Sequence, residues 1–132
     1  MTIIIDWPWQ HFTRDEMQCQ CGCGRATMDT AFMDRLERLR GAYGKPMRVS
    51  SGYRCAAHNL AVAHTGSTGP HTTGHAVDIL ITSPDAWNLV RLATCLGFTG
   101  IGVSQTGTPA NHFIHLDDLR APAYPRPWLG SY

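Results

Sequence analysis

Hydrophobic residues recur with two different periods along this chain, and each period predicts a type of element. Between residues 29 and 43 they recur every three or four positions with charged residues between them, which predicts an amphipathic helix. Asp29 can cap the start of this helix, and Gly44 followed by Pro46 ends it. Its apolar face consists of Phe32, Met33, Leu36, Leu39 and Tyr43.

Shorter apolar stretches, bounded by glycine, proline and small polar residues, predict the remaining helices and strands. In the segment around Asp78 the side chains alternate, so Asp78 should share one face of a strand with Ala76 and Leu80. The spacing of Thr13 and Glu16 is typical of a capping box, which predicts a short helical turn. The predicted strands cover residues 47–50, 75–81, 100–103 and 112–117, and the other predicted helices cover residues 55–63 and 83–96.

Together these elements predict a single α+β domain over residues 1–132. We expect a small, mainly antiparallel sheet with helices packed on one side. Residues 1–18 form a lead-in to this domain, and residues 119–132 form a proline-rich tail that packs on it as an extended segment. No internal repeat or linker divides the chain.

The composition excludes several classes of protein. A chain of 132 residues with 43% hydrophobic and 16% charged residues is globular, and its net charge of +1 gives no reason to expect nucleic acid as a partner. The chain shows neither a secretory signal nor a run long enough to span a membrane. We therefore expect a monomer that is cytoplasmic as synthesised.

Three residues form a candidate metal site: His71, Asp78 and His115. Two imidazole nitrogens and a carboxylate oxygen suit Zn²⁺, and three protein ligands leave a position for water, as in catalytic zinc sites. Asp78 lies in an apolar strand, where a carboxylate without a partner costs several kcal/mol. Coordination removes that cost, so the sequence predicts one catalytic zinc ion held by these three side chains.

The same residues give the chain a resemblance to a known family. The segment from Ser50 to Cys55 contains SGYR, His71 and Asp78 have the spacing H-x(6)-D, and His115 lies in the sequence Phe113 to Asp117. In this order the three blocks resemble the M15 zinc peptidases, a family of D-Ala-D-Ala carboxypeptidases and L-Ala-D-Glu endopeptidases, and most closely the members of its subfamily A. The resemblance implies a hedgehog/DD-peptidase-like fold.

The family resemblance also implies an activity. It implies hydrolysis of peptidoglycan stem peptides by a D,D-carboxypeptidase or an L,D-endopeptidase. A wall enzyme without an export signal resembles a phage endolysin, which is released to the cell wall at lysis.

Further site roles follow from this resemblance. Arg54 is similar to the family arginine over the scissile carbonyl, where it would bind substrate and stabilise the oxyanion. The family places its general base either as a glutamate three residues before the second histidine ligand or as a histidine two residues before it, and this chain has His112 and Phe113 at those positions. His112 is the first choice for the general base and Asp117 the second, although Asp117 can instead orient His115 or pair with Arg54. Ser51 and Tyr53 are candidate substrate-binding residues. At position 69 this chain has glycine where the family usually has serine.

Five cysteines allow several interpretations. Cys19, Cys21 and Cys23 form a C-x-C-x-C loop, which can be a tight turn with small buried thiols, a disulfide to Cys55, or a second, structural metal site completed by Cys55. Cys95 lies on a predicted apolar helix face, where we expect it in the core.

Other functions stay open. The chain can be a non-catalytic cell-wall-binding or structural module that keeps the fold, or a cytoplasmic D-Ala-D-Ala dipeptidase. A cysteine hydrolase built on the C-x-C-x-C loop has no histidine or asparagine placed to support it.

Overall fold

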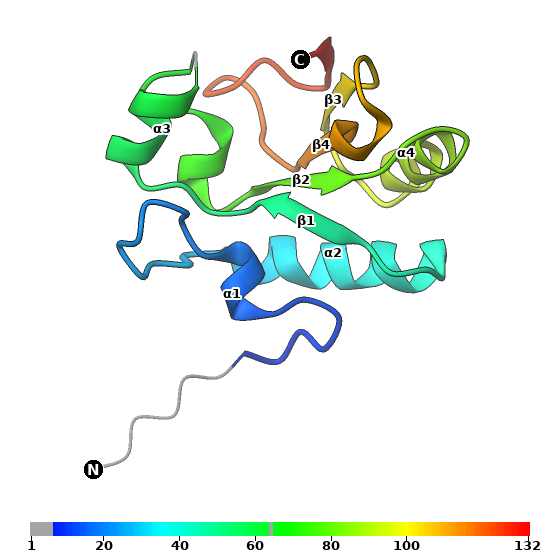
Figure 1. Cartoon of the computed structure of the whole chain (residues 1–132), viewed down its shortest axis with the longest axis horizontal. Helices are drawn as coiled ribbons and strands as arrows, with labels where there is room; N and C mark the ends of the chain where they lie inside the picture. The colour runs from blue at the N-terminus through cyan, green and yellow to red at the C-terminus, as the bar shows by residue number, and fades with distance from the viewer. Residues whose placement is uncertain (1–6, 64) are drawn as a thin grey trace.

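A five-stranded sheet organises the chain, as a computed structural model describes it for residues 7–63 and 65–132 (Figure 1). The strand order is β1-β2-β4-β3-β5, and every neighbouring pair is antiparallel except β3 and β5. The predicted α+β class with a mainly antiparallel sheet is confirmed. The first six residues of the predicted lead-in lie outside the described residues. The strands are β1 (Arg48–Ser51), β2 (Ala76–Leu80), β3 (Gly100–Ser104), β4 (Phe113–Asp117) and β5 (Trp128–Ser131).

The helices form where the sequence predicts them. The capping box of Thr13 and Glu16 is present, with the Thr13 side chain accepting from the Glu16 amide. Asp29 caps the longest helix through the Phe32 amide, and Gly44 ends it in the left-handed conformation. The helices are α1 (Arg14–Met17), α2 (Thr30–Tyr43), α3 (Ala56–Val62) and α4 (Asp85–Cys95), with two 3-10 turns, η1 (Pro70–Thr73) and η2 (Pro109–Asn111).

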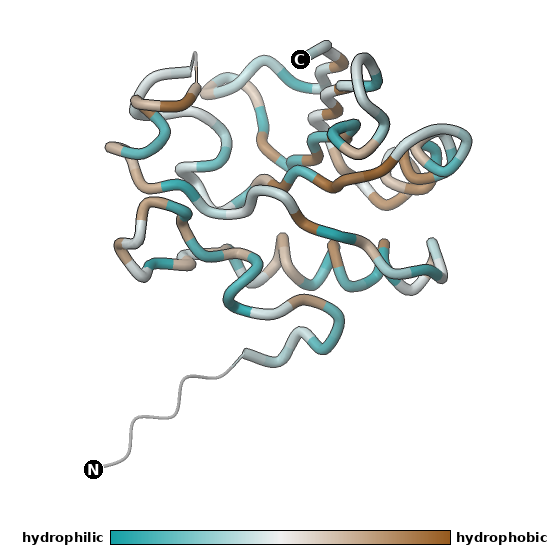
Figure 2. The backbone as a smooth tube through the Cα atoms, in the orientation of Figure 1, coloured by the Kyte–Doolittle hydropathy of each residue, from teal (hydrophilic) through white to brown (hydrophobic). Residues whose placement is uncertain are grey.

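Helices α2 and α4 cover one face of the sheet and enclose the core. The alternation of β2 and β4 sends Val77 and Ile79, with Ile114 and Leu116, into this core. Figure 2 shows apolar and hydrophilic residues alternating along α2, because only one side of that helix meets the sheet. The core residues that α2 contributes are Phe32, Met33, Leu36 and Leu39.

The opposite face of the same two strands is polar in the middle of the sheet. There Asp78 lies directly across from His115, and Ala76 lies across from Asp117. All three polar side chains are buried. Gly100 on β3 makes room for this arrangement, since a Cβ there would overlap the Asp117 carboxylate.

The proline-rich tail packs on the domain and contains a strand that the sequence does not predict. Residues 128–131 form β5, which pairs in parallel with β3. Proline residues earlier in the tail hide this strand from sequence patterns, because Pro cannot donate to a ladder. The tail therefore completes the sheet beside His115.

Within residues 7–63 and 65–132, the structure contains no helix with both the length and the apolar character of a membrane span.

The turn from η1 into β2 depends on Gly74, and a substitution there tests this. Gly74 has φ 77°, and a Cβ would overlap the carbonyl oxygen of Thr27. Gly44 has the same φ with open space around it. We expect Gly44→Ala to lower the free energy of unfolding by about 1–2 kcal/mol, and Gly74→Ala to lower it by about 1–3 kcal/mol more because the backbone must shift. Equal losses in urea titrations of the two variants would contradict the close approach at Gly74.

Candidate metal centre

Three side chains from three elements of the fold meet on the polar face of the sheet. Asp78 on β2 and His115 on β4 are direct cross-strand partners, and η1 brings His71 against them. The Asp78 Oδ1 atom lies 3.0 Å from the His115 Nδ1 atom and 3.2 Å from the His71 Nε2 atom. All three predicted metal ligands are thus brought together, with ligand atoms within 4.8 Å of one another.

The outer nitrogen of His71 is held by the backbone. Its Nδ1 atom lies 2.8 Å from the carbonyl oxygen of Gly52, in the loop after β1. Because a carbonyl only accepts, Nδ1 carries the proton and donates it. This contact turns the Nε2 atom of His71 toward Asp78 and fixes the tautomer that a metal ligand needs.

The outer nitrogen of His115 is held by a carboxylate. Its Nε2 atom lies 2.7 Å from the Asp117 Oδ2 atom, and Asp117 accepts two more bonds from the Arg126 guanidinium at 2.8 and 2.7 Å. Asp117 thus makes the contact to His115 that its orienting alternative requires, and its arginine partner is Arg126 and not the predicted Arg54. Carboxylate–histidine pairs of this kind position imidazoles at zinc sites.

Electrostatics inside the cluster favour charged carboxylates. Burial by itself raises the pKa of Asp78, but the charges and hydrogen bonds of His71 and His115 outweigh it and hold that pKa well below its usual range. Burial likewise raises the pKa of Asp117, yet His115 and Arg126 lower it to about 2. Burial lowers the pKa of His115, but the two carboxylates raise it above its ordinary value. A metal ion binds only neutral imidazole, so its affinity should fall as the pH falls.

The donor set fits a catalytic zinc ion. Two neutral imidazole nitrogens and one carboxylate oxygen converge, each imidazole has its second nitrogen engaged, and the set has the composition of open zinc sites. A cavity of about 190 Å³ adjoins His71 and Asp78 and is also lined by Arg54, Phe113 and Tyr132. Such a cavity can admit solvent or a substrate group beside the ligands.

Arg54 lies where a cationic group can act on this cavity. Its Nη2 atom is 3.8 Å from the Asp78 Oδ2 atom, its Nη1 atom donates to the Asn59 side chain, and its backbone amide donates to the His71 carbonyl. Of the other predicted substrate-binding residues, Ser51 is buried on β1 across from Asp78, and Tyr53 is half-buried. Neither of these two side chains lines the cavity.

The structure does not bring His112 to the cluster. It precedes β4, with its Nδ1 atom 2.8 Å from the Thr82 hydroxyl and its Nε2 atom 2.9 Å from the Gly107 carbonyl oxygen. One nitrogen therefore contacts the segment between β2 and α4, and the other contacts the loop between β3 and β4. The position two residues before His115 is Phe113, which faces the cavity. The general-base role of His112 stays a prediction without a contact to support it.

Two contributors to the site were missed by sequence reasoning. Arg126 lies in the tail, where no periodic pattern marks it, and only its charge between prolines could have drawn attention. The Gly52 carbonyl has no signal in a sequence, because every residue carries one.

Position 69, where the family usually has serine, has no room for a side chain in this structure. A Cβ there would overlap the Thr65 hydroxyl oxygen.

The comparison with protein families agrees with this geometry, whereas no curated protein and no solved structure matches the chain. The family described as Peptidase M15 matches residues 10–117, a span that contains the SGYR segment and all three ligands of the cluster. The members of this family are zinc-dependent metallopeptidases. The chain therefore belongs to the Peptidase M15 family.

Proposed function

We propose that this protein is a zinc peptidase that hydrolyses peptide bonds in peptidoglycan stem peptides, as a D,D-carboxypeptidase or an L,D-endopeptidase. The observation that carries the proposal is the convergence of His71, Asp78 and His115 beside a cavity, with both imidazoles oriented by a second partner. A role as a phage endolysin, released to the wall at lysis, belongs to the same proposal.

Each residue has a defined part in this reaction. His71, Asp78 and His115 would hold the zinc ion, which supplies a Lewis acid and an activated water when bound. The Arg54 guanidinium, near Asp78 and lining the cavity, would stabilise the negative charge that develops on the scissile carbonyl oxygen. Asp117 keeps the His115 ring in the binding orientation.

The surface beside the cavity supports a peptide as substrate. A groove of about 810 Å³ shares Thr65, Pro70 and Tyr132 with the cavity and continues along the tail past Tyr124 and Trp128. Aromatic and proline side chains give it an apolar wall, and Arg126 adds a polar group. A groove of this size can bind several residues of an extended stem peptide and bring one carbonyl to the cluster.

A second candidate has its own supporting observation. Phe113, two residues before His115, lines the cavity and carries no group that can accept a proton. Both nitrogens of His112 lie within hydrogen-bond distance of Thr82 and Gly107 and not of the cluster. A cluster that His112 does not contact is compatible with a wall-binding module that keeps the metal and has no turnover. The two candidates differ in whether peptidoglycan is cleaved or only bound.

Metal removal separates these candidates. We expect the purified protein to release peptides from sacculi, to lose this activity with a chelator, and to regain it with Zn²⁺. Asp78→Ala should abolish both zinc binding at the cluster and release, because it removes a ligand. Asp15→Ala, which removes an exposed carboxylate, is the matched control.

Product analysis by mass spectrometry completes this test. Cleavage of free D-Ala-D-Ala without release from sacculi would instead identify a dipeptidase. Binding to sacculi without any product would favour the wall-binding module.

The tail residue Arg126 should control zinc affinity from outside the ligand set. Arg126→Ala removes both bonds to Asp117, so the His115 ring loses its fixed orientation. We expect zinc to bind about 10–100-fold more weakly, as measured by competition with a chromogenic chelator. Arg120→Ala, which removes an exposed arginine six residues earlier, should leave the affinity unchanged. An equal zinc affinity in the two variants would show that Asp117 positions His115 without help.

Arg54 should act on turnover and not on metal content. Arg54→Ala removes the cation that faces the cavity, and we expect kcat to fall by about 10²–10³-fold while zinc stays bound. Arg48→Ala, at an exposed position of β1, is the control for loss of charge. If only KM rises, Arg54 binds substrate without stabilising the transition state.

A further inference from the structure

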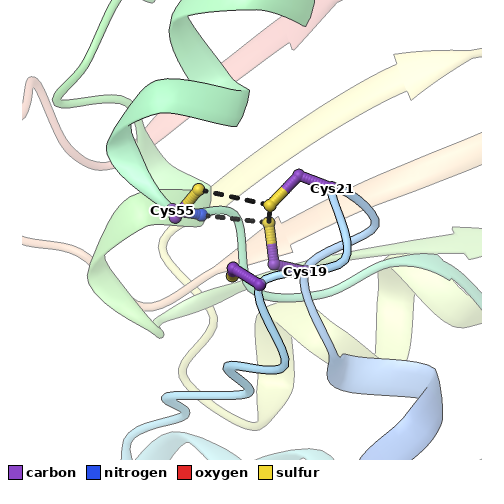
Figure 3. A group of neighbouring side chains, drawn as sticks. Cys19, Cys21 and Cys55 are labelled. Atoms are coloured by element: carbon purple, nitrogen blue, oxygen red, sulfur yellow. Dashed lines mark hydrogen bonds between the residues drawn. The ribbon is translucent and has the colours of Figure 1, made fainter.

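A second group of metal-binding side chains lies outside the peptidase cluster. The C-x-C-x-C loop before α2 folds against the start of α3, so that Cys19, Cys21 and Cys23 surround Cys55. The four sulfur atoms all lie within 4.8 Å of one another. Figure 3 shows Cys19, Cys21 and Cys55 pointing toward a common centre from two segments far apart in the sequence.

The sulfur spacing matches a coordination shell and not a disulfide. The Cys19 and Cys21 Sγ atoms are 3.4 Å apart, and the Cys21 and Cys55 Sγ atoms are 3.6 Å apart. A disulfide requires about 2.05 Å. Four sulfurs about 2.3 Å from a central zinc ion form a tetrahedron with edges of about 3.8 Å. These two distances are slightly shorter than that edge, the other sulfur pairs lie within 4.8 Å, and all four cysteines are free thiols in the structure.

The backbone around the cluster is arranged to receive thiolates. The Cys55 amide donates to the Cys19 sulfur at 3.3 Å, and the His58 amide donates to the Cys55 sulfur at 3.4 Å from the first turn of α3. Amide donors to sulfur favour the charged form that binds metal. Cys55 and Cys19 are 3% and 2% exposed, so two ligands are buried and the other two close the site from the solvent side.

Hydrogen bonds restrain the loop that carries three of these cysteines. Its glycines at positions 22 and 24 are left-handed with no atom near the place of a Cβ, and the Arg14 guanidinium donates to the Gly24 carbonyl. The Cys19 amide closes the loop on the Arg25 carbonyl, and the Gln20 side chain donates to the Ser50 carbonyl. A metal ion bound by the four sulfurs would add a link between this loop and the start of α3 beyond these hydrogen bonds.

We propose that Cys19, Cys21, Cys23 and Cys55 bind a structural zinc ion that ties the N-terminal segment to the start of α3. This site is closed, with four protein ligands, unlike the open peptidase cluster. The cysteine site lies next to residues of the peptidase cluster in the sequence. Cys55 directly follows Arg54, and the Gly52 carbonyl accepts from His71. A metal here would fix the segment that carries both groups, and it does not depend on the peptidase activity proposed above.

Metal content distinguishes the two sites. We expect the reduced wild-type protein to contain about two zinc ions per chain by elemental mass spectrometry. His71→Ala/Asp78→Ala should retain one ion, held by the cysteines, and Cys21→Ser/Cys23→Ser should lose one. Cys95 is exposed on α4 and not in the core as predicted, so Cys95→Ser should leave the metal content unchanged. A wild-type protein with metal only at the peptidase cluster would overturn this proposal and leave the proposed function intact.

A spectroscopic measurement covers the case in which the cysteine variant does not fold. The His71→Ala/Asp78→Ala protein, loaded with Co²⁺, should show intense thiolate-to-cobalt charge-transfer absorption with the visible bands of a tetrahedral site. A mercurial thiol reagent should then release the metal as the thiols are consumed. Absence of charge-transfer absorption, or a Cys21–Cys55 disulfide in the unreduced protein by mass spectrometry, would overturn the proposal.

Discussion

The buried carboxylate of Asp78 is the constraint on which the rest of the structure depends. A charged group on the face of a central strand is costly unless it is paired. Here two imidazoles approach the same oxygen, one from the neighbouring strand and one from the η1 turn. Each imidazole must in turn have its other nitrogen satisfied, and the partners come from the β1 loop and from Asp117.

The need to pair buried charges also determines where the C-terminal segment lies. Its own charge is balanced by Arg126, so the tail has to return to the polar face of the sheet. Glycine at position 100 leaves room for the Asp117 carboxylate. The β5 strand then pairs with β3 and brings Trp128 and Tyr132 around His115, which is fully buried. A tail without regular patterning thus completes both the sheet and the site.

The parts that the sequence predicts are those with periodicity or distinctive chemistry. The apolar period of α2 and the caps at Asp29 and Gly44 define that helix, and Asp78 in an apolar strand identifies the cluster. The α+β class follows from the order of the elements. Strand β5 and the Arg126 contact could not be predicted, because they depend on how an aperiodic tail closes in space. The position of His112 depends in the same way on the loop that ends at β4.

Anomalous diffraction at the zinc edge tests the metal centre most directly. Crystals of the zinc-loaded protein should show a strong peak bonded to the His71 Nε2 atom, an Asp78 carboxylate oxygen and the His115 Nδ1 atom, at about 2.0–2.2 Å from each. A map with no peak among these three side chains, at a zinc concentration that saturates the protein, would contradict the assignment of this cluster as a metal centre.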